Sequence, residues 1–283
     1  MVAALGARGT AVLNGDDPNV LWMRGATSAR IVTYGFAASC DVRADNVRLD
    51  WPAGTRFRLS AFGEEREAFA RLIGRHSLYA ALAAVAVARS ESVPLDEALG
   101  RLESLPPTIG RMQPVALPGG AWVLRDDYKS TPETIHSALD VLAEVPAVRR
   151  LALLGNVWEE PVPLASTYRA LGARVARLAS LVVVVGKGRA SYRAGALEAG
   201  MAPTSIIDGE DSPQAIAAVL RPLLRAGDVL LIKGHRAQRL GRVCLLLQGQ
   251  AVRCGIPDCH LRTVNCEDCP MLKTGWGNHR PVT

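Results

Sequence analysis

The stretch Arg125-Asp126-Asp127-Tyr128-Lys129-Ser130-Thr131-Pro132-Glu133 lies between a short apolar segment, residues 121–124, and a segment with helical spacing. In that second segment the apolar positions follow an i, i+3, i+4, i+7 pattern, which predicts a helix over 134–144 with one buried face. Ser130 and Glu133 have the spacing of a capping box, and Pro132 suits the first helical turn. The stretch is therefore predicted to be a strand-to-helix turn of an α/β fold.

This turn is also a candidate nucleotide site. The backbone N–H groups at the start of a helix have no partners within the helix and attract phosphate. Lys129 could pair with a phosphate, and Asp127 could hold a ribose hydroxyl or the water of a magnesium ion. The alternative is a solvated loop before a surface helix, and the spacing alone does not separate the two.

The rest of the second half alternates regularly between strands and helices. Residues 181–185 form an all-apolar run, as in a parallel strand that is covered on both faces. The alternation predicts a doubly wound, Rossmann-like α/β domain. Its expected strands are 115–117, 121–124, 151–154, 181–185, 205–207 and 228–232, and its expected helices are 134–144, 166–178, 190–199, 213–224 and 237–247.

The first half has a different pattern. Two short strands, at 11–13 and 30–34, precede three alternating segments that predict hairpins, at 42–49, 56–62 and 67–72. Helices are expected at 78–88 and 95–103. Two prolines and a glycine in 105–111 indicate a linker. We therefore expect three parts: a domain over 1–110, a second over 111–250, and a short cysteine-rich tail over 251–283.

Composition narrows the class of protein. The chain has 283 residues, 49% of them apolar, and a net charge of +6. The arginines are scattered without interleaved aromatic residues, which disfavours nucleic acid, whereas anionic nucleotides and UDP-linked substrates suit the charge. No apolar run approaches the roughly 18 residues of a membrane span, and the first residues do not form a signal peptide. We expect a cytoplasmic protein.

Four of the six cysteines crowd into one short segment, at Cys254, Cys259, Cys266 and Cys269. Four thiolates can close a tetrahedral Zn²⁺ site, which would fix a tail too short to bury a core. An iron–sulfur site and unliganded or redox-active thiols are the alternatives. Cys40 and Cys244 are expected to be ordinary buried residues.

Several segments occur in an order that is typical of one family. They are Asn14-Gly15-Asp16-Asp17-Pro18, Gly74-Arg75-His76, Gly110-Arg111-Met112, the turn at 126–132, Gly155-Asn156-Val157-Trp158-Glu159-Glu160 and Lys233-Gly234-His235. In this order the chain resembles the Mur ligases, ATP-dependent enzymes that build the peptide stem of peptidoglycan, and most of all the MurF branch. The resemblance implies the C-terminal part of the central ATPase domain followed by the Rossmann-like C-terminal domain.

The resemblance also implies a reaction. A carboxylate of a UDP-MurNAc-peptide attacks the γ-phosphate of ATP with Mg²⁺, and the amine of a D-Ala-D-Ala-type dipeptide then attacks the acyl phosphate. Such a ligase serves cell wall biogenesis, and through it cell shape and cell division.

Carried over by position, the family pattern assigns roles to individual residues. The nucleotide would be held by Asn14, Asp16, His76, Arg111, Asp127 and Lys129, and of these Asp127 and Lys129 are the catalytic candidates. The substrate-binding candidates are Asn156, Glu159, Lys233, His235 and Arg236.

The chain departs from the family pattern in important places. It has no G-x-x-x-x-G-K-[ST] P-loop, and the family's magnesium ligands would lie before residue 1. Asn156 replaces an aspartate, and His235 replaces a serine. We therefore expect an incomplete ligase that is inactive alone and that works with a P-loop half, which a separate chain could carry. The alternative is a non-catalytic binding or assembly subunit with a zinc-stabilised tail.

Overall fold

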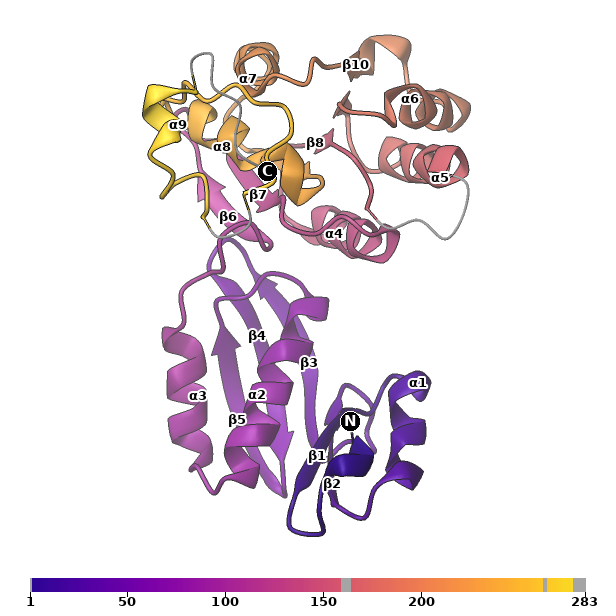
Figure 1. Ribbon diagram of the computed structural model, residues 1–283, viewed down its shortest axis with the longest axis vertical. Coiled ribbons are helices and arrows are strands. Elements are labelled where there is room, and N and C mark those ends of the chain that lie inside the picture. The colour runs from indigo at the N-terminus through magenta and orange to yellow at the C-terminus, as the bar shows by residue number, and fades with distance from the viewer. Residues whose placement is uncertain (1, 159–163, 262–263, 277–283) are drawn as a thin grey trace. The chain divides into compact units, whose positions relative to one another are not determined.

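The computed structural model describes residues 2–158, 164–261 and 264–276, and it divides the chain into two compact units, Met1–Pro107 and Thr108–Thr283 (Figure 1). The division falls inside the proline-containing linker, three residues before the expected boundary at 110/111. Each unit has its own sheet and its own apolar core.

The first unit is built on a five-stranded sheet whose strands lie in chain order. The strands β1, β2 and β3 are parallel, and β3, β4 and β5 form two antiparallel hairpins, which confirms the hairpins predicted from the alternating segments. The strands are β1 (Thr10–Asn14), β2 (Arg30–Gly35), β3 (Val42–Asp50), β4 (Gly54–Ala61) and β5 (Glu64–Ala70).

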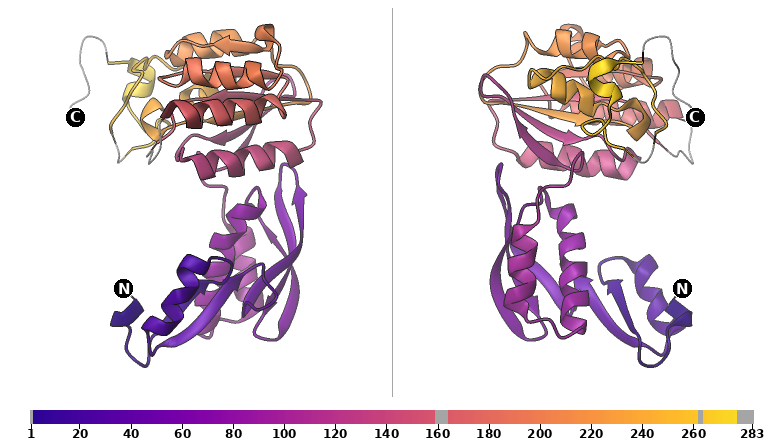
Figure 2. Two further views of the ribbon diagram at one scale, coloured as in Figure 1. Left: turned by 90° about the vertical axis from the view of Figure 1, so that its right-hand side faces the viewer. Right: turned by 60° about the vertical axis from the view of Figure 1, so that its left-hand side comes forward.

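Two helices, α2 (Leu78–Ser90) and α3 (Leu95–Ser104), cover one face of this sheet (Figure 2). The buried residues of α2 include Ala81 and Ala86, whose small side chains allow the helix to lie close to the strands. Short helical segments complete the unit, at η1 (Val2–Ala4), α1 (Pro18–Leu21), η2 (Trp22–Ala26) and η3 (Arg75–Ser77).

The second unit is a doubly wound α/β domain, and the predicted fold class is confirmed. Its sheet has the order β10-β9-β8-β11-β7-β6, and all neighbours are parallel except the edge strand β6, which runs antiparallel to β7. All six residues of β11 are buried, as expected of a central parallel strand. The strands are β6 (Gln113–Ala116), β7 (Trp122–Asp126), β8 (Arg149–Leu154), β9 (Leu181–Val184), β10 (Ile206–Asp208) and β11 (Asp228–Lys233).

The direction in which the chain crosses the sheet decides which face each helix covers. From β7 the chain steps through β8 and β9 to β10, and then returns to β11 in the middle. Right-handed crossovers therefore place α4 (Pro132–Glu144), α5 (Leu164–Ala176) and α6 (Arg189–Glu198) on one face. The helices α7 (Pro213–Leu220) and α8 (Gly241–Leu247) share one buried cluster on the other.

The structure corrects two local expectations. The capping box was wrong: Thr131 is the N-cap residue of α4, and Ser130 is fully buried and donates its hydroxyl to the carbonyl of Asn156 at 2.7 Å. The helix expected at 237–247 is divided into η5 (Arg236–Gln238) and α8, because Arg239 has a left-handed backbone with φ of 51°.

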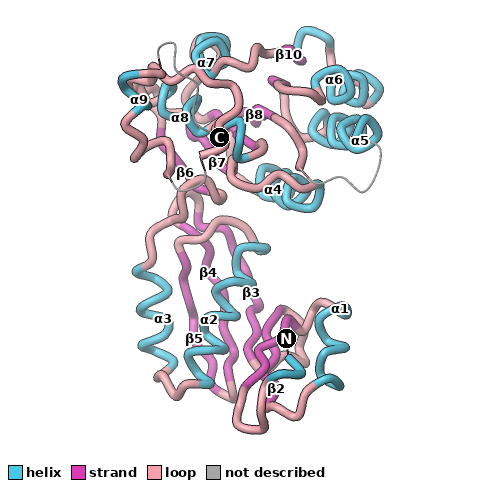
Figure 3. Tube along the Cα trace, in the orientation of Figure 1, coloured by secondary structure: helices cyan, strands magenta, loops and turns pink. Residues whose placement is uncertain are grey.

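The tail has little regular structure of its own beyond residue 250 (Figure 3). Among the described residues it forms the short helix α9 (Met271–Thr274), and Val252 and Leu272 pack with Leu245 in a small apolar cluster. Searched over the described part of the chain, no helix is both long and apolar enough to cross a membrane.

The carboxylate of Asp16 organises the carboxyl ends of β1 and β2 in the first unit. Its Oδ2 accepts hydrogen bonds from the N–H of Phe36 at 2.7 Å and from the hydroxyl of Tyr79 at 2.9 Å, and its Oδ1 accepts from the N–H of Ala37 at 2.9 Å. Burial acts to raise the pKa of Asp16, but these hydrogen bonds outweigh it and the pKa is lowered. Burial and the hydrogen bond to Asp16 raise the pKa of Tyr79 to about 12.

We expect the Asp16 contribution to stability to depend on pH. Because the folded-state pKa is depressed, the contribution is present above the unfolded value of 3.8 and is lost as the pH falls through the folded-state pKa. Denaturant unfolding of the wild type and of Asp16→Asn should therefore differ most near neutral pH, and the difference should shrink below pH 3.8. Glu97→Gln, at an exposed position of α3, is the control. A difference that does not change with pH would contradict the role assigned to Asp16.

Candidate functional site

The topology of the second unit predicts where a ligand-binding crevice lies. After β8 the chain passes to α5 on one face of the sheet, and after β11 it passes to α8 on the other. Where neighbouring parallel strands send their connections to opposite faces, a crevice opens at their carboxyl ends, and ligands bind there in open α/β sheets. The loops that follow β7, β8 and β11 therefore form the candidate site.

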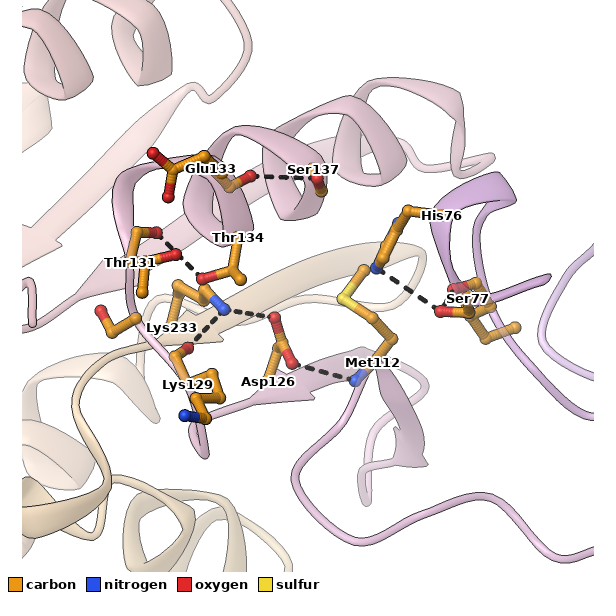
Figure 4. Close-up of polar contacts among 12 residues, drawn as sticks. His76, Ser77, Met112, Asp126, Lys129, Thr131, Glu133, Thr134, Ser137 and Lys233 are labelled. Carbon is orange, nitrogen blue, oxygen red and sulfur yellow. Dashed lines mark hydrogen bonds and ion pairs between the residues drawn. The ribbon is translucent and has the colours of Figure 1, made fainter. Parts of the chain in front are cut away.

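A buried ion pair joins two of these strand ends (Figure 4). Lys233, the last residue of β11, is 1% exposed, and its Nζ lies 2.6 Å from Oδ2 of Asp126, the last residue of β7. Nζ also donates to the carbonyl of Lys129 at 2.6 Å, and Oδ1 of Asp126 accepts from the N–H of Met112 at 3.3 Å. Burial lowers the pKa of Lys233, and the neighbouring Asp126 opposes that shift.

Lys233 therefore lies beneath the surface of the site, and its contacts with Asp126 and with the carbonyl of Lys129 hold the turn at 126–131 in place. Direct contact between Lys233 and a substrate, as predicted from the family pattern, stays a prediction.

Asp127 is also buried, with 7% of its surface exposed. Its Oδ1 accepts from Nε of Arg125 at 2.8 Å, and its Oδ2 accepts from the N–H of Gly241, the first residue of α8, at 2.7 Å. Arg125 additionally pairs with Glu267 in the tail. Both oxygens of Asp127 therefore have structural partners, and its predicted contact with ribose stays untested.

The exposed rim of the site pairs cations with aromatic rings. Nζ of Lys129 lies 5.3 Å from the ring centroid of Trp158, whose ring meets that of His235 edge-on at 4.4 Å. The guanidinium of Arg236 stacks on Tyr128 at 4.9 Å and donates to its hydroxyl at 3.2 Å. Such contacts orient a cation without neutralising it. The rim therefore presents oriented positive charge, which suits an anionic ligand.

Asn156 braces the loops that follow β8 and β9. Its Oδ1 accepts from the N–H of Lys187 at 2.8 Å, and its own N–H donates to Oε1 of Gln238 at 2.6 Å. A Cβ at Gly155 would lie 2.3 Å from the same Oε1, so a larger residue there would displace the Gln238 side chain from Asn156. As with Lys233, the structure shows Asn156 positioning its neighbours, and its predicted substrate contact is not tested.

A pocket of about 810 Å³ opens beside this rim. It is within the usual size range of small-molecule sites and combines aromatic walls with a few polar groups. Its lining includes Asn156, Trp158, Tyr168, Lys187, His235 and His260. Asp258 also lines it, so the cysteine-rich tail contributes to its wall.

Two of the remaining nucleotide-site candidates, Asn14 and His76, lie in the first unit, and a third, Arg111, lies in the second unit near Lys233. Asn14 accepts a hydrogen bond from the N–H of Asp16 at 3.0 Å, and His76 is exposed beside Ser77 in the first unit. Arg111 is exposed in the second unit, close enough to Lys233 to act on its pKa. Glu159, a substrate-binding candidate, lies outside the described residues.

Two of the six cysteines are buried within the two units, as expected, and the other four lie in the tail. Cys40 and Cys244 are buried in the two units, at 8% and 1% exposure. The four tail cysteines are unbridged and line one small cavity. Across the described ranges, however, no group of three or more His, Cys, Asp or Glu residues is arranged to hold a metal ion, so the expected zinc site is not formed in this conformation.

Sequence reasoning missed three residues that organise the site, namely Arg125, Asp126 as the partner of Lys233, and Gln238. Asp126 depends on the pairing of β7 with β11, and Arg125 depends on its contact with Glu267 in the tail, so both involve segments that are distant in sequence. Gln238 had a local signal, because His235-x-x-Gln238 has capping-box spacing and forms that box at the start of η5.

Comparison with known proteins agrees with this architecture. The Mur ligase middle domain model matches residues 1–88, and the model of the Mur ligase glutamate ligase domain matches residues 110–236. The chain therefore belongs to the Mur ligase family and carries its middle and C-terminal domains. Among relatives, the UDP-N-acetylmuramoyl-tripeptide--D-alanyl-D-alanine ligases of Mycobacterium bovis and Mycobacterium tuberculosis are each 33% identical over 258 residues. That match covers 83% of this chain and 50% of each relative.

Solved structures show the same fold. A crystal structure of MurF from Acinetobacter baumannii has a TM-score of 0.75 at 21% identity, over 87% of this chain and 53% of that one. MurF from Thermotoga maritima, in complex with ADP, has a TM-score of 0.71 at 21% identity, over 88% and 55%. The chain spans about half the length of the relatives it matches.

The buried Lys233–Asp126 pair gives a stability prediction. Asp126→Asn leaves the Lys233 ammonium buried without its counter-charge, and we expect a loss of about 3–5 kcal/mol in the free energy of unfolding of the second unit. The double variant Asp126→Leu/Lys233→Met removes both charges and should lose clearly less. Denaturant unfolding measures both. Equal losses in the single and double variants would show that the pair has no electrostatic role.

Proposed function

We propose that this chain supplies the C-terminal half of the site of an ATP-dependent peptidoglycan precursor ligase, which joins a D-Ala-D-Ala-type dipeptide to a UDP-MurNAc-peptide. The observation that carries the proposal is the oriented cationic rim beside a large pocket, at the carboxyl ends of β8 and β11, in a chain of the Mur ligase family. In our proposal such a ligase acts in the cytoplasm.

The reaction needs positive charge and close positioning. A peptide carboxylate attacks the γ-phosphorus of ATP and displaces ADP, and the dipeptide amine then attacks the acyl carbon, releases phosphate and loses a proton. Negative charge builds up on the phosphoryl group in the first step and on the acyl oxygen in the second. Lys129 and Arg236 are exposed or half-exposed cations held by Trp158 and Tyr128, and in our proposal they stabilise that charge.

The pocket suits the incoming amine. A dipeptide is a zwitterion with a compact apolar middle, and the pocket combines the Trp158 and Tyr168 rings with a cation, Lys187, and a carboxylate, Asp258. In our proposal Lys187 receives the dipeptide carboxylate, and Asp258 receives the ammonium before it loses its proton.

The described residues fit ATP and Mg²⁺ only in part. Lys129 and Arg236 can meet phosphate, but the sequence has no P-loop to enclose a triphosphate. ATP, with its magnesium ion, supplies the phosphoryl group that activates the carboxylate. We propose that the P-loop residues lie outside these 283 residues, on a longer polypeptide or on a second chain.

The proposal is tested by measuring phosphate release with ATP, Mg²⁺, UDP-MurNAc-tripeptide and D-Ala-D-Ala. We expect no turnover from these 283 residues alone, and dipeptide-dependent turnover once a Mur ligase P-loop half is added. In the active assembly, Lys129→Ala should lower kcat about 100-fold, because it removes a charge that acts in the transition state. Lys187→Ala should instead raise the KM for the dipeptide.

The matched control is Lys273→Ala, an exposed lysine on α9, which should leave both parameters unchanged. Dipeptide binding without turnover in every combination would favour the alternative, a non-catalytic binding or assembly subunit. Turnover by the 283 residues alone would contradict the proposed division of the site.

A further inference from the structure

The four tail cysteines converge on one cavity although they are spread over 16 residues of an irregular segment. The cavity has a volume of about 20 Å³, and its lining includes Arg239, Arg242, Cys254, Cys259, Cys266 and Cys269. All four thiols are unbridged. A space of this size holds about one water or one single ion.

Backbone hydrogen bonds hold these four cysteines in place. The N–H of Cys254 donates to the carbonyl of Leu272 at 3.3 Å, and the N–H of Cys259 donates to that of Ala237 in η5 at 2.7 Å. Cys266 and Cys269 lie on one tight turn, closed by the N–H of Cys269 and the carbonyl of Cys266 at 3.2 Å. Hydrogen bonds therefore connect the four cysteines to η5 and to α9, and connect Cys269 to Cys266.

Two buried arginines give independent evidence for negative charge in this cavity. Arg242 is 1% exposed, and its guanidinium contacts backbone carbonyls and Sγ of Cys254, which lies 3.2 Å from Nη1. Arg239 is 7% exposed; its Nη1 donates to the carbonyl of Val264 at 3.1 Å, but its buried Nε and Nη2 have no hydrogen-bond partner among the described residues. Within the described residues neither arginine forms an ion pair, and the nearby Glu267 is paired with Arg125.

A buried guanidinium without a counter-charge is costly, because desolvation is not compensated by attraction. Four neutral thiols do not supply that charge. Four thiolates on one divalent ion carry a net charge of −2, which matches the two arginines. The N–H···S contact of Arg242 with Cys254 is also the kind of outer contact that orients a metal-bound sulfur.

We propose that this cavity binds one Zn²⁺ through Cys254, Cys259, Cys266 and Cys269, with Arg239 and Arg242 as its counter-charges. Binding converts Zn²⁺ and four thiols into a tetrathiolate complex and releases four protons. No three of these sulfur atoms are yet arranged to hold an ion among the described residues, so binding draws them inward around the cavity. The site is closed and structural, since four protein ligands leave no position open.

The site has a consequence for the neighbouring pocket. Asp258 and His260, which line the pocket, flank Cys259 directly in sequence. Fixing Cys259 to the metal therefore fixes the tail's contribution to the pocket wall. The metal proposal itself does not depend on the ligase function, because its test measures bound metal.

The test is metal analysis of the full chain, purified under reducing conditions without chelator. We expect one zinc per chain, and a cobalt-substituted form with the intense visible bands of tetrahedral thiolate-bound cobalt. Cys266→Ser/Cys269→Ser should lose most of the metal and those bands. The matched control is Cys40→Ser, in the other unit, which should retain one zinc per chain. Arg239→Gln should weaken zinc affinity at least tenfold in chelator competition.

The cobalt spectrum of the wild type keeps the test decisive if the double cysteine variant does not fold. The proposal is overturned by a wild-type chain with four freely titrating tail thiols and no metal, by bound iron in place of zinc, or by equal loss of metal in Cys40→Ser.

Discussion

The candidate site depends on one buried contact, the ion pair of Lys233 and Asp126. It joins the carboxyl ends of β11 and β7, and through the carbonyl of Lys129 it also holds the turn that carries the exposed rim. A lysine in this position cannot remain charged in an apolar core without a carboxylate beside it. The pair therefore sets the distance between the two loops whose side chains meet in the crevice.

Around this contact, the site separates into a hidden and an exposed layer. Asp126, Asp127 and Lys233 are buried, and their polar atoms are used to hold backbone and one another. Lys129 and Arg236 are more exposed and lie against aromatic rings. Rigid support beneath oriented charge is the arrangement that electrostatic catalysis requires, because the charges are in place before the transition state forms.

The sequence was sufficient for most of the fold and for part of the site. The apolar run at 181–185 and the alternation of elements predicted the parallel sheet, because both patterns are local. The pairing of Asp126 with Lys233 was missed because their separation is 107 residues, and a chain pattern does not show which strands become neighbours. Ser130 was assigned to a helix cap because its spacing fitted, but tertiary contact with Asn156 prevailed.

The central claim is that ligands bind in the crevice at the carboxyl ends of β8 and β11. The most direct measurement is NMR of the isotope-labelled chain during titration with D-Ala-D-Ala, following backbone amides and the tryptophan indole N–H signals. The account predicts saturable shifts at Trp158, Lys187 and His235, and none at Trp22, an exposed residue of the first unit. Saturable shifts confined to other parts of the chain would contradict it.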